Sequence, residues 1–287
     1  MPHALTDDGI RIAYRAFGPA SGEPVLMIQG LGTDSKGWIA QRLAFGRKYR
    51  CLAPDNRGIG GSDRPAEPFD IERMADDMIA VLDDAGVDSA HVMGASLGGI
   101  VAQLVAVRYP ERVRSLVLAC TACHHTNWRR ELLADWSELV RSQGMRTFAA
   151  QNLRWIVGPR SMRRFWPLMR VVGPVAMGCP PSSFVAQVDA ILAADDSIRG
   201  ELTALRVPTL VLVGSQDILT PLADSEELAE RIPGASLAVV PGAAHGFMFE
   251  NAATFNRVVT RFLDGVIADQ AQQTSPAAAP VPLAGTA

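Results

Sequence analysis

The sequence predicts an α/β protein in which helices cover both faces of a mostly parallel sheet. Short apolar runs alternate along the chain with segments whose apolar residues recur at helical spacing, which is typical of such folds. Glycine-rich or polar loops follow several of the runs, at the edge where parallel sheets gather functional groups. The 287 residues are 48% hydrophobic and 20% charged, as in an ordinary globular protein.

Seven apolar runs are expected to form the strands. The first alternates between apolar and polar residues and reads as an edge strand, whereas the next is continuously apolar and reads as a buried one. In chain order the seven runs are residues 10–17, 25–28, 50–53, 91–93, 113–119, 207–213 and 237–240.

Three segments carry clear helical patterns between these runs. Asp70 can cap a helix whose apolar residues share one face and which Gly86 ends. Residues 100–106 form a second apolar helix, and residues 251–266 close the fold with apolar positions at helical spacing.

The strand rhythm stops between Thr121 and Val207, which divides the chain into a core and an insertion. We expect a core of residues 1–122 and 207–267, interrupted by a helical cap of residues 123–206 that is rich in Trp, Met and Arg. Residues 268–287 are rich in Ala, Gln and Pro without periodicity, so we expect a disordered tail.

The most informative pattern is the G-x-S-x-G run from Gly94 to Gly98, between a strand-like and a helix-like segment. Small residues on either side let Ser96 occupy a sharp, strained turn at a helix N-terminus. In that position the N–H of Leu97 can face a developing oxyanion. The pattern therefore predicts a nucleophilic serine.

A serine nucleophile needs a base and an acid, which follow it in chain order in folds of this kind. His245 is the only histidine in the C-terminal part and lies in a loop of small residues after a strand, so it is the candidate base. Asp217, in the loop after residues 207–213, is the candidate acid. The nearby carboxylates, Asp224, Glu226 and Glu227, fall on a helical pattern that favours solvated charges.

A second oxyanion donor is expected from the loop that follows residues 25–28. The loop reads Gln29-Gly30-Leu31-Gly32. In folds with a G-x-S-x-G turn, a backbone N–H from this loop binds the oxyanion, so the N–H of Leu31 is the candidate.

The cysteines form a pattern with two alternative readings. Cys120 to His124 matches the C-x-x-C-H attachment site of c-type haem, and Cys120, Cys123, His124 and His125 could offer zinc ligands. Cys120 ends a strand-like run, and zinc sites usually add a second, distant ligand pair, so we expect neither group. The role of these four residues stays open.

The net charge of −3 gives no electrostatic reason to expect nucleic-acid binding. The first residues lack the basic and apolar regions of a signal peptide, and no apolar run approaches the ~18 residues that span a bilayer. We therefore expect a cytoplasmic protein with free thiols and no membrane association. The sequence does not indicate the oligomeric state.

From about residue 9 to residue 267 the sequence resembles the α/β-hydrolase superfamily. The resemblance implies a catalytic triad of Ser96, Asp217 and His245. It is carried by Gly30-Leu31-Gly32 with Trp38, the run from Asp55 to Ser62, the run from Gly94 to Gly98 (the serine elbow), the run from Tyr109 to Val113, the run from Gly214 to Asp217, and the run from Gly242 to His245.

Within that superfamily the chain is most similar to 3-oxoadipate enol-lactonases. The similarity lies in Gly32-Thr33-Asp34, in Thr121-Ala122 with Trp128, and in Gln143-Gly144-Met145 followed by Arg154-Trp155. It implies that Arg154, Trp155 and Trp128 bind the substrate, with the arginine facing a carboxylate. Gln29 and Ile59 depart from the family's usual histidines.

The implied activity is hydrolysis of a small-molecule carboxylic ester or lactone through an acyl-enzyme, without cofactor or metal. Two alternatives use the same residues. One is a carbon–carbon bond hydrolase or lyase, and the other is a hydrolase-fold receptor with vestigial activity. A serine at the elbow, rather than an aspartate, argues against dehalogenase or epoxide hydrolase chemistry.

Overall fold

A computed structural model describes residues 1–163 and 179–274 of the chain. Within these two ranges, eight strands form one sheet, in the order β1-β2-β4-β3-β5-β6-β7-β8. Strands β1 and β2 pair antiparallel, β2 and β4 also pair antiparallel, and all remaining neighbours are parallel. The strands are β1 His3–Leu5, β2 Arg11–Phe17, β3 Pro24–Ile28, β4 Arg50–Pro54, β5 Ala90–Ala95, β6 Val113–Ala119, β7 Thr209–Gly214 and β8 Ser236–Val240.

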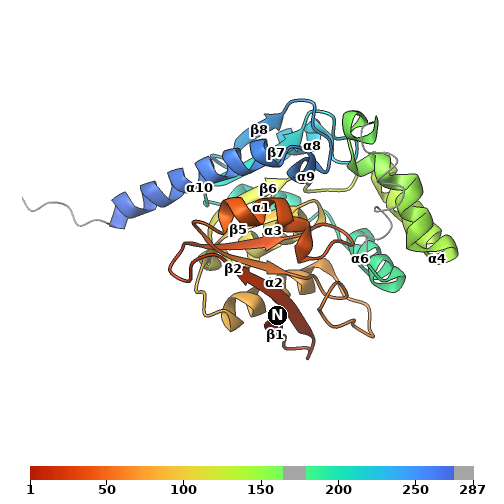
Figure 1. The fold of residues 1–287 in the computed structure, drawn as a ribbon, viewed down its shortest axis with the longest axis horizontal. Coiled ribbons are helices and arrows are strands. Elements are labelled where there is room, and N and C mark those ends of the chain that lie inside the picture. The colour runs from red at the N-terminus through yellow and green to blue at the C-terminus, as the bar shows by residue number, and fades with distance from the viewer. Residues whose placement is uncertain (164–178, 275–287) are drawn as a thin grey trace, which may run out of the picture.

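Helices pack on both faces of the sheet, as predicted (Figure 1). Helices α2 (Ile71–Asp84), α3 (Leu97–Arg108) and α8 (Leu222–Arg231) bury their apolar residues in one core cluster. A second cluster contains buried residues of α1 (Ile39–Phe45), α9 (Phe247–Glu250) and α10 (Ala252–Thr274). Short 3-10 helices lie at Ser35–Trp38, Pro110–Arg112 and Leu202–Ala204.

The predicted cap is helical in its described part, which lies at one end of the sheet (Figure 1). It contains α4 (Asn127–Ile156), α6 (Pro181–Ala193) and α7 (Ile198–Glu201). Helix α4 is kinked at Gly144, whose φ of 77° is in the left-handed region that glycine adopts readily. Residues 164–178 of the predicted cap lie outside the described residues.

The seven predicted strands are present, and their boundaries differ by a few residues. The sequence reading missed β1, because a strand of three residues offers too little alternation to be detected. The prediction that residues 10–17 form an edge strand is therefore wrong, since β2 pairs with β1 on one side and with β4 on the other. Asp70 caps α2 as predicted, since its side chain accepts a hydrogen bond of 2.7 Å from the backbone N–H of Arg73.

The prediction of a disordered tail from residue 268 is wrong for residues 268–274, which continue α10. Alanine and glutamine favour a helix even without an apolar stripe, so periodicity alone ended the predicted helix too early. The side chain of Gln270 also donates a hydrogen bond to the carbonyl of Arg114. Residues 275–287 lie outside the described residues. None of the described helices has the length and apolar content needed to cross a bilayer.

Candidate active site

Ser96 occupies the predicted sharp turn between β5 and α3. Its φ of 53° and ψ of −120° lie in a region that residues with a side chain rarely adopt. The turn is tight: a β-carbon at Gly94 would lie only 2.0 Å from the carbonyl oxygen of Gly98, and one at Gly98 would lie only 2.2 Å from the carbonyl oxygen of Ile28. Only glycine fits at both positions, and the serine side chain is thereby held above the sheet.

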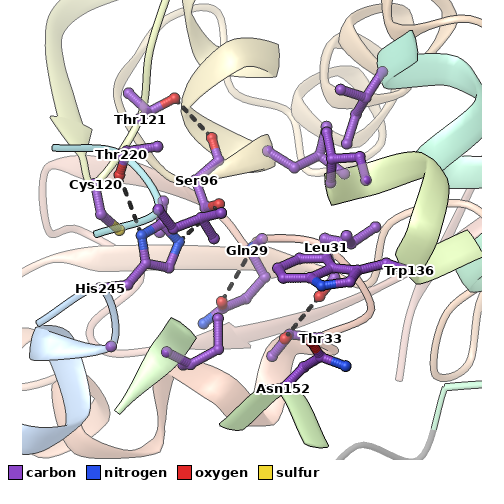
Figure 2. Close-up of a pocket in the computed structure, with 18 of the residues that line it drawn as sticks. Gln29, Leu31, Thr33, Ser96, Cys120, Thr121, Trp136, Asn152, Thr220 and His245 are labelled. Carbon is purple, nitrogen blue, oxygen red and sulfur yellow. Dashed lines mark hydrogen bonds between the residues drawn. The ribbon is translucent and has the colours of Figure 1, made fainter. Parts of the chain in front are cut away.

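The structure brings Ser96, His245 and Asp217 together in one chain of hydrogen bonds. Figure 2 shows the part of it that joins Ser96 and His245. The Oγ atom of Ser96 lies 3.0 Å from Nε2 of His245, and Nδ1 of His245 lies 2.8 Å from Oδ2 of Asp217. An ionised carboxylate only accepts hydrogen bonds, so Nδ1 carries the proton and Nε2 is free to accept from the serine. The three residues follow β5, β8 and β7 at the carboxyl edge of the sheet.

The carboxylate of Asp217 is fully surrounded by hydrogen-bond donors. Its Oδ1 accepts from the backbone N–H groups of Leu219 and Thr220, both at 2.9 Å. Its Oδ2 accepts from the Thr220 hydroxyl as well as from His245. Burial alone raises the pKa of Asp217, but the charge on His245 and these hydrogen bonds outweigh it, so its pKa lies below the ordinary value. The acid is therefore ionised at neutral pH.

The amides of the loop after β3 leave one donor without a protein acceptor. The N–H of Gly30 is bonded to Gln29 Oε1, that of Gly32 to Gln187 Oε1, and that of Thr33 to the carbonyl of Gly30. In the described part of the chain, the N–H of Leu31 has no such acceptor.

This free amide lies beside the serine. A β-carbon at Gly30 would be 3.2 Å from Cβ of Ser96, so the loop backbone is in contact with the elbow. At the start of α3 the N–H of Leu97 likewise has no acceptor among the described residues, as expected of a first helical turn. Both predicted oxyanion donors are therefore uncommitted and adjacent to Ser96.

Ser96 and His245 open onto a cavity of about 300 Å³ between the sheet edge and the cap (Figure 2). Most of the side chains that line it are apolar and come from α4, α6 and the loops around β7 and α9. They include Leu133, Trp136, Phe148, Phe184, Ile191 and Met248. Asn152, Thr33 and Thr121 add polar groups to the lining.

Within residues 1–163 and 179–274, the cavity lining contains one guanidinium, that of Arg129, and it is fully engaged by the protein. Arg129 forms a buried ion pair with Asp224 and donates to the carbonyl oxygens of Leu219 and His124. Among the described residues, no lining side chain therefore offers an unpaired charge to a substrate.

The three residues predicted to bind the substrate lie outside the described lining of this cavity. Arg154 is exposed, and its guanidinium packs 5.7 Å from the ring centre of Trp155. Positions 148, 152 and 156 of α4 face the cavity, and residue 154 falls on the opposite side of the helix. Trp155 packs edge-on against the lining residue Trp136. Trp128 stacks on Trp155, and 40% of Trp128 is exposed.

The four candidate zinc ligands Cys120, Cys123, His124 and His125 lie in two different places. Cys120 and His125 line the cavity. Cys123 and His124 instead lie near Glu227, with all three potential ligand atoms within 4.8 Å of one another. The carboxylate of Glu227 already pairs with Arg199 and Arg231, whose positive charges oppose a bound cation. The cluster does not form the four-ligand site that the sequence pattern offered.

The sequence matches the alpha/beta hydrolase fold family over residues 23–154, and residues 179–252 match a family described as serine aminopeptidase S33. A protein of Caulobacter segnis with the name "Putative carbamate hydrolase RutD" is 30% identical over 91% of this chain and 98% of its own length. The chain belongs to the α/β-hydrolase family, and a hydrolase activity is what its relatives support.

Two enol-lactonases are also among its relatives. The 3-oxoadipate enol-lactonase 2 of Acinetobacter baylyi is 29% identical over 89% of this chain and 94% of its own length. The crystal structure of the enol-lactonase from Burkholderia xenovorans LB400 superimposes with a TM-score of 0.85 at 28% identity, covering 92% of this chain and all of that one. The resemblance stated from the sequence is thus confirmed.

Proposed function

We propose that the protein is a serine hydrolase that cleaves carboxylic esters or lactones through an acyl-enzyme. The hydrogen-bonded chain Ser96–His245–Asp217 at the floor of the cavity is the observation that carries this proposal. A hydroxyl next to an oriented imidazole is activated as a nucleophile, and the carboxylate stabilises the imidazolium that forms.

In the proposed reaction His245 takes the proton of Ser96 as Oγ attacks the carbonyl carbon. The backbone N–H groups of Leu31 and Leu97 stabilise the tetrahedral oxyanion, and the leaving alcohol receives the proton from His245. Water activated by His245 then releases the acid from Ser96. All the groups in these steps belong to the protein, to the substrate or to water.

The cavity favours an uncharged acyl group. Its described lining is mostly apolar and offers no unpaired charge, so a substrate carboxylate would lose its hydration without compensation. A volume of about 300 Å³ is at the small end of ligand pockets, which favours short acyl chains. Relatives named for enol-lactone and carbamate hydrolysis suggest a lactone and a carbamate as further substrates to test.

Initial rates on a matched panel test this function. The panel contains p-nitrophenyl acetate to decanoate, a simple γ-lactone, a neutral carbamate and enzymatically generated 3-oxoadipate enol-lactone. We expect turnover of short p-nitrophenyl esters that Ser96→Ala removes almost entirely. A Ser96→Ala variant with wild-type turnover would contradict the mechanism. If the whole panel is inert, carbon–carbon cleavage or a receptor role becomes the better interpretation.

The same panel tests the position of Arg154. Because its side chain is exposed, Arg154→Ala should leave kcat/KM for neutral esters within about twofold of wild type. A large preference for the enol-lactone that is lost in Arg154→Ala would instead establish the specific enol-lactonase role.

A further inference from the structure

Helix α6 of the cap packs directly against the loop that carries the Leu31 amide. A β-carbon at Gly32 would lie 3.1 Å from Cδ2 of Phe184, so the helix leaves little room for a side chain there. Gly32 also has a φ of 67°, which glycine adopts without strain. Helix α6 therefore contacts this loop and also lines the cavity.

One side chain of α6 makes the polar part of this contact. Gln187, one helical turn after Phe184, is fully buried, and its Oε1 accepts a hydrogen bond of 3.0 Å from the backbone N–H of Gly32. Its Nε2 donates a longer bond, of 3.5 Å, to the carbonyl of Arg57 in the loop after β4. Gln187 thus joins the cap to two loops at the carboxyl edge of the sheet.

We propose that Gln187 is a positioning residue for the oxyanion site, acting through the Gly32 amide on the adjacent N–H of Leu31. The proposal rests on the serine hydrolase function proposed above. Gln187 itself lies behind the loop and does not contact the reacting atoms in this mechanism.

The hydrogen-bond inventory of the loop gives the physical reason. The Gly32 N–H is buried, and without Gln187 it would lack an acceptor, which a loop avoids by rotating its peptide units. The N–H of Leu31 and the carbonyl of Gly30 belong to one planar peptide unit, and that carbonyl accepts a hydrogen bond from the N–H of Thr33, the residue after Gly32. A rearrangement at Gly32 therefore also changes the direction of the Leu31 N–H. Oxyanion donors must point at the place where the negative charge develops, so a small rotation lowers the rate.

Three variants at position 187 test the proposal. Gln187→Met keeps the length but loses the acceptor, Gln187→Asn keeps the amide but is too short to reach Gly32, and Gln187→Glu keeps an acceptor for the Gly32 N–H. For each variant, kcat and KM on a short p-nitrophenyl ester are measured together with the Ki of an alkyl trifluoromethyl ketone. Such a ketone forms a tetrahedral adduct with the serine and so reports oxyanion binding.

We expect Gln187→Met and Gln187→Asn to lower kcat by about 10- to 100-fold while KM stays within about threefold. The Ki of the ketone should rise by a similar factor, and Gln187→Glu should recover most of kcat. Gln151, exposed on α4, provides the control variant Gln151→Met, which should behave as wild type.

Wild-type kcat in both Gln187→Met and Gln187→Asn would overturn the proposal. So would equal losses in all three variants that follow the melting temperature, because they would show a merely structural role. If Gln187→Met does not fold, the comparison of kcat and Ki between Gln187→Asn and Gln187→Glu still tests the proposal. Failure of the hydrolase function looks different, because the wild-type protein would then neither turn over esters nor form the ketone adduct.

Discussion

The hydroxyl of Thr220 donates a hydrogen bond of 2.8 Å to Oδ2 of Asp217, the same oxygen that accepts from Nδ1 of His245. The hydroxyl also lies 3.2 Å from that nitrogen. Thr220 therefore holds the carboxylate in the orientation that the imidazole needs, and its own backbone N–H binds the other carboxylate oxygen.

Thr220→Val is expected to lower kcat by about 10- to 100-fold, the effect of one hydrogen bond to a charged group. The pKa of Asp217 should rise as well, because the hydroxyl is one of the groups that lower it. Thr220→Ser keeps the hydroxyl and should retain most of the activity. Steady-state rates of both variants check this, and equal rates for Val and Ser would show that the hydroxyl is dispensable.

Asp217→Asn should lower kcat by about 10³- to 10⁴-fold, because the amide cannot stabilise the imidazolium and favours the wrong tautomer of His245. The matched control is Glu226→Gln, which removes an exposed carboxylate of α8 that lies near Asp217 in the sequence. The control should keep wild-type rates. Comparable losses in both variants would mean that the wrong acid has been assigned.

Gly98→Ala should destabilise the protein by about 3 kcal/mol or more, because its β-carbon would lie 2.2 Å from the carbonyl oxygen of Ile28. Gly265→Ala lies in the middle of α10, and its β-carbon would meet no described atom within 4 Å outside the adjacent backbone, so it should stabilise the protein by about 0.5–1 kcal/mol. Urea unfolding of the two variants checks these opposite signs. A stable Gly98→Ala protein would disprove the tight packing at the elbow.

His91 should make the protein less stable as the pH falls. Burial, with a smaller effect from Arg114, lowers the pKa of His91 from 6.5 to about 4. Between these values the unfolded chain binds a proton that the folded protein does not bind, so the free energy of unfolding decreases as the pH falls through this window.

We expect His91→Asn to reduce the loss of stability between pH 7 and pH 5 by about 2 kcal/mol. Urea unfolding at the two pH values measures it, and His3→Asn, at an exposed position of β1, is the control variant. An equal loss in wild type and His91→Asn would show that His91 does not contribute.

The sheet and the positions of Ser96, Asp217 and His245 could be predicted because each depends on a local pattern. Apolar runs specify strands, the glycines around Ser96 permit one sharp turn, and strand ends in a parallel sheet meet at one edge. The hydrogen bonds between the three residues follow from that edge. Their catalytic role stays a prediction until the variants are measured.

The cavity lining could not be predicted in the same way. Arg154 and Trp128 are close to lining residues in the sequence, but the face of α4 that meets the sheet depends on how the cap docks. Trp136, Phe148 and Phe184 offered no local signal, because an aromatic residue in a helical pattern packs in most cores.

By itself the sequence determined the fold class, the serine elbow and the candidate acid and base, because these depend on backbone periodicity, on glycine and on residues at strand ends. The tertiary structure alone decided which helix face lines the cavity, that Arg129 is neutralised by Asp224, and that Gln187 of the cap bonds to Gly32. Those relationships join residues far apart in the chain. They arise when helices pack against the sheet edge and buried polar groups must find partners.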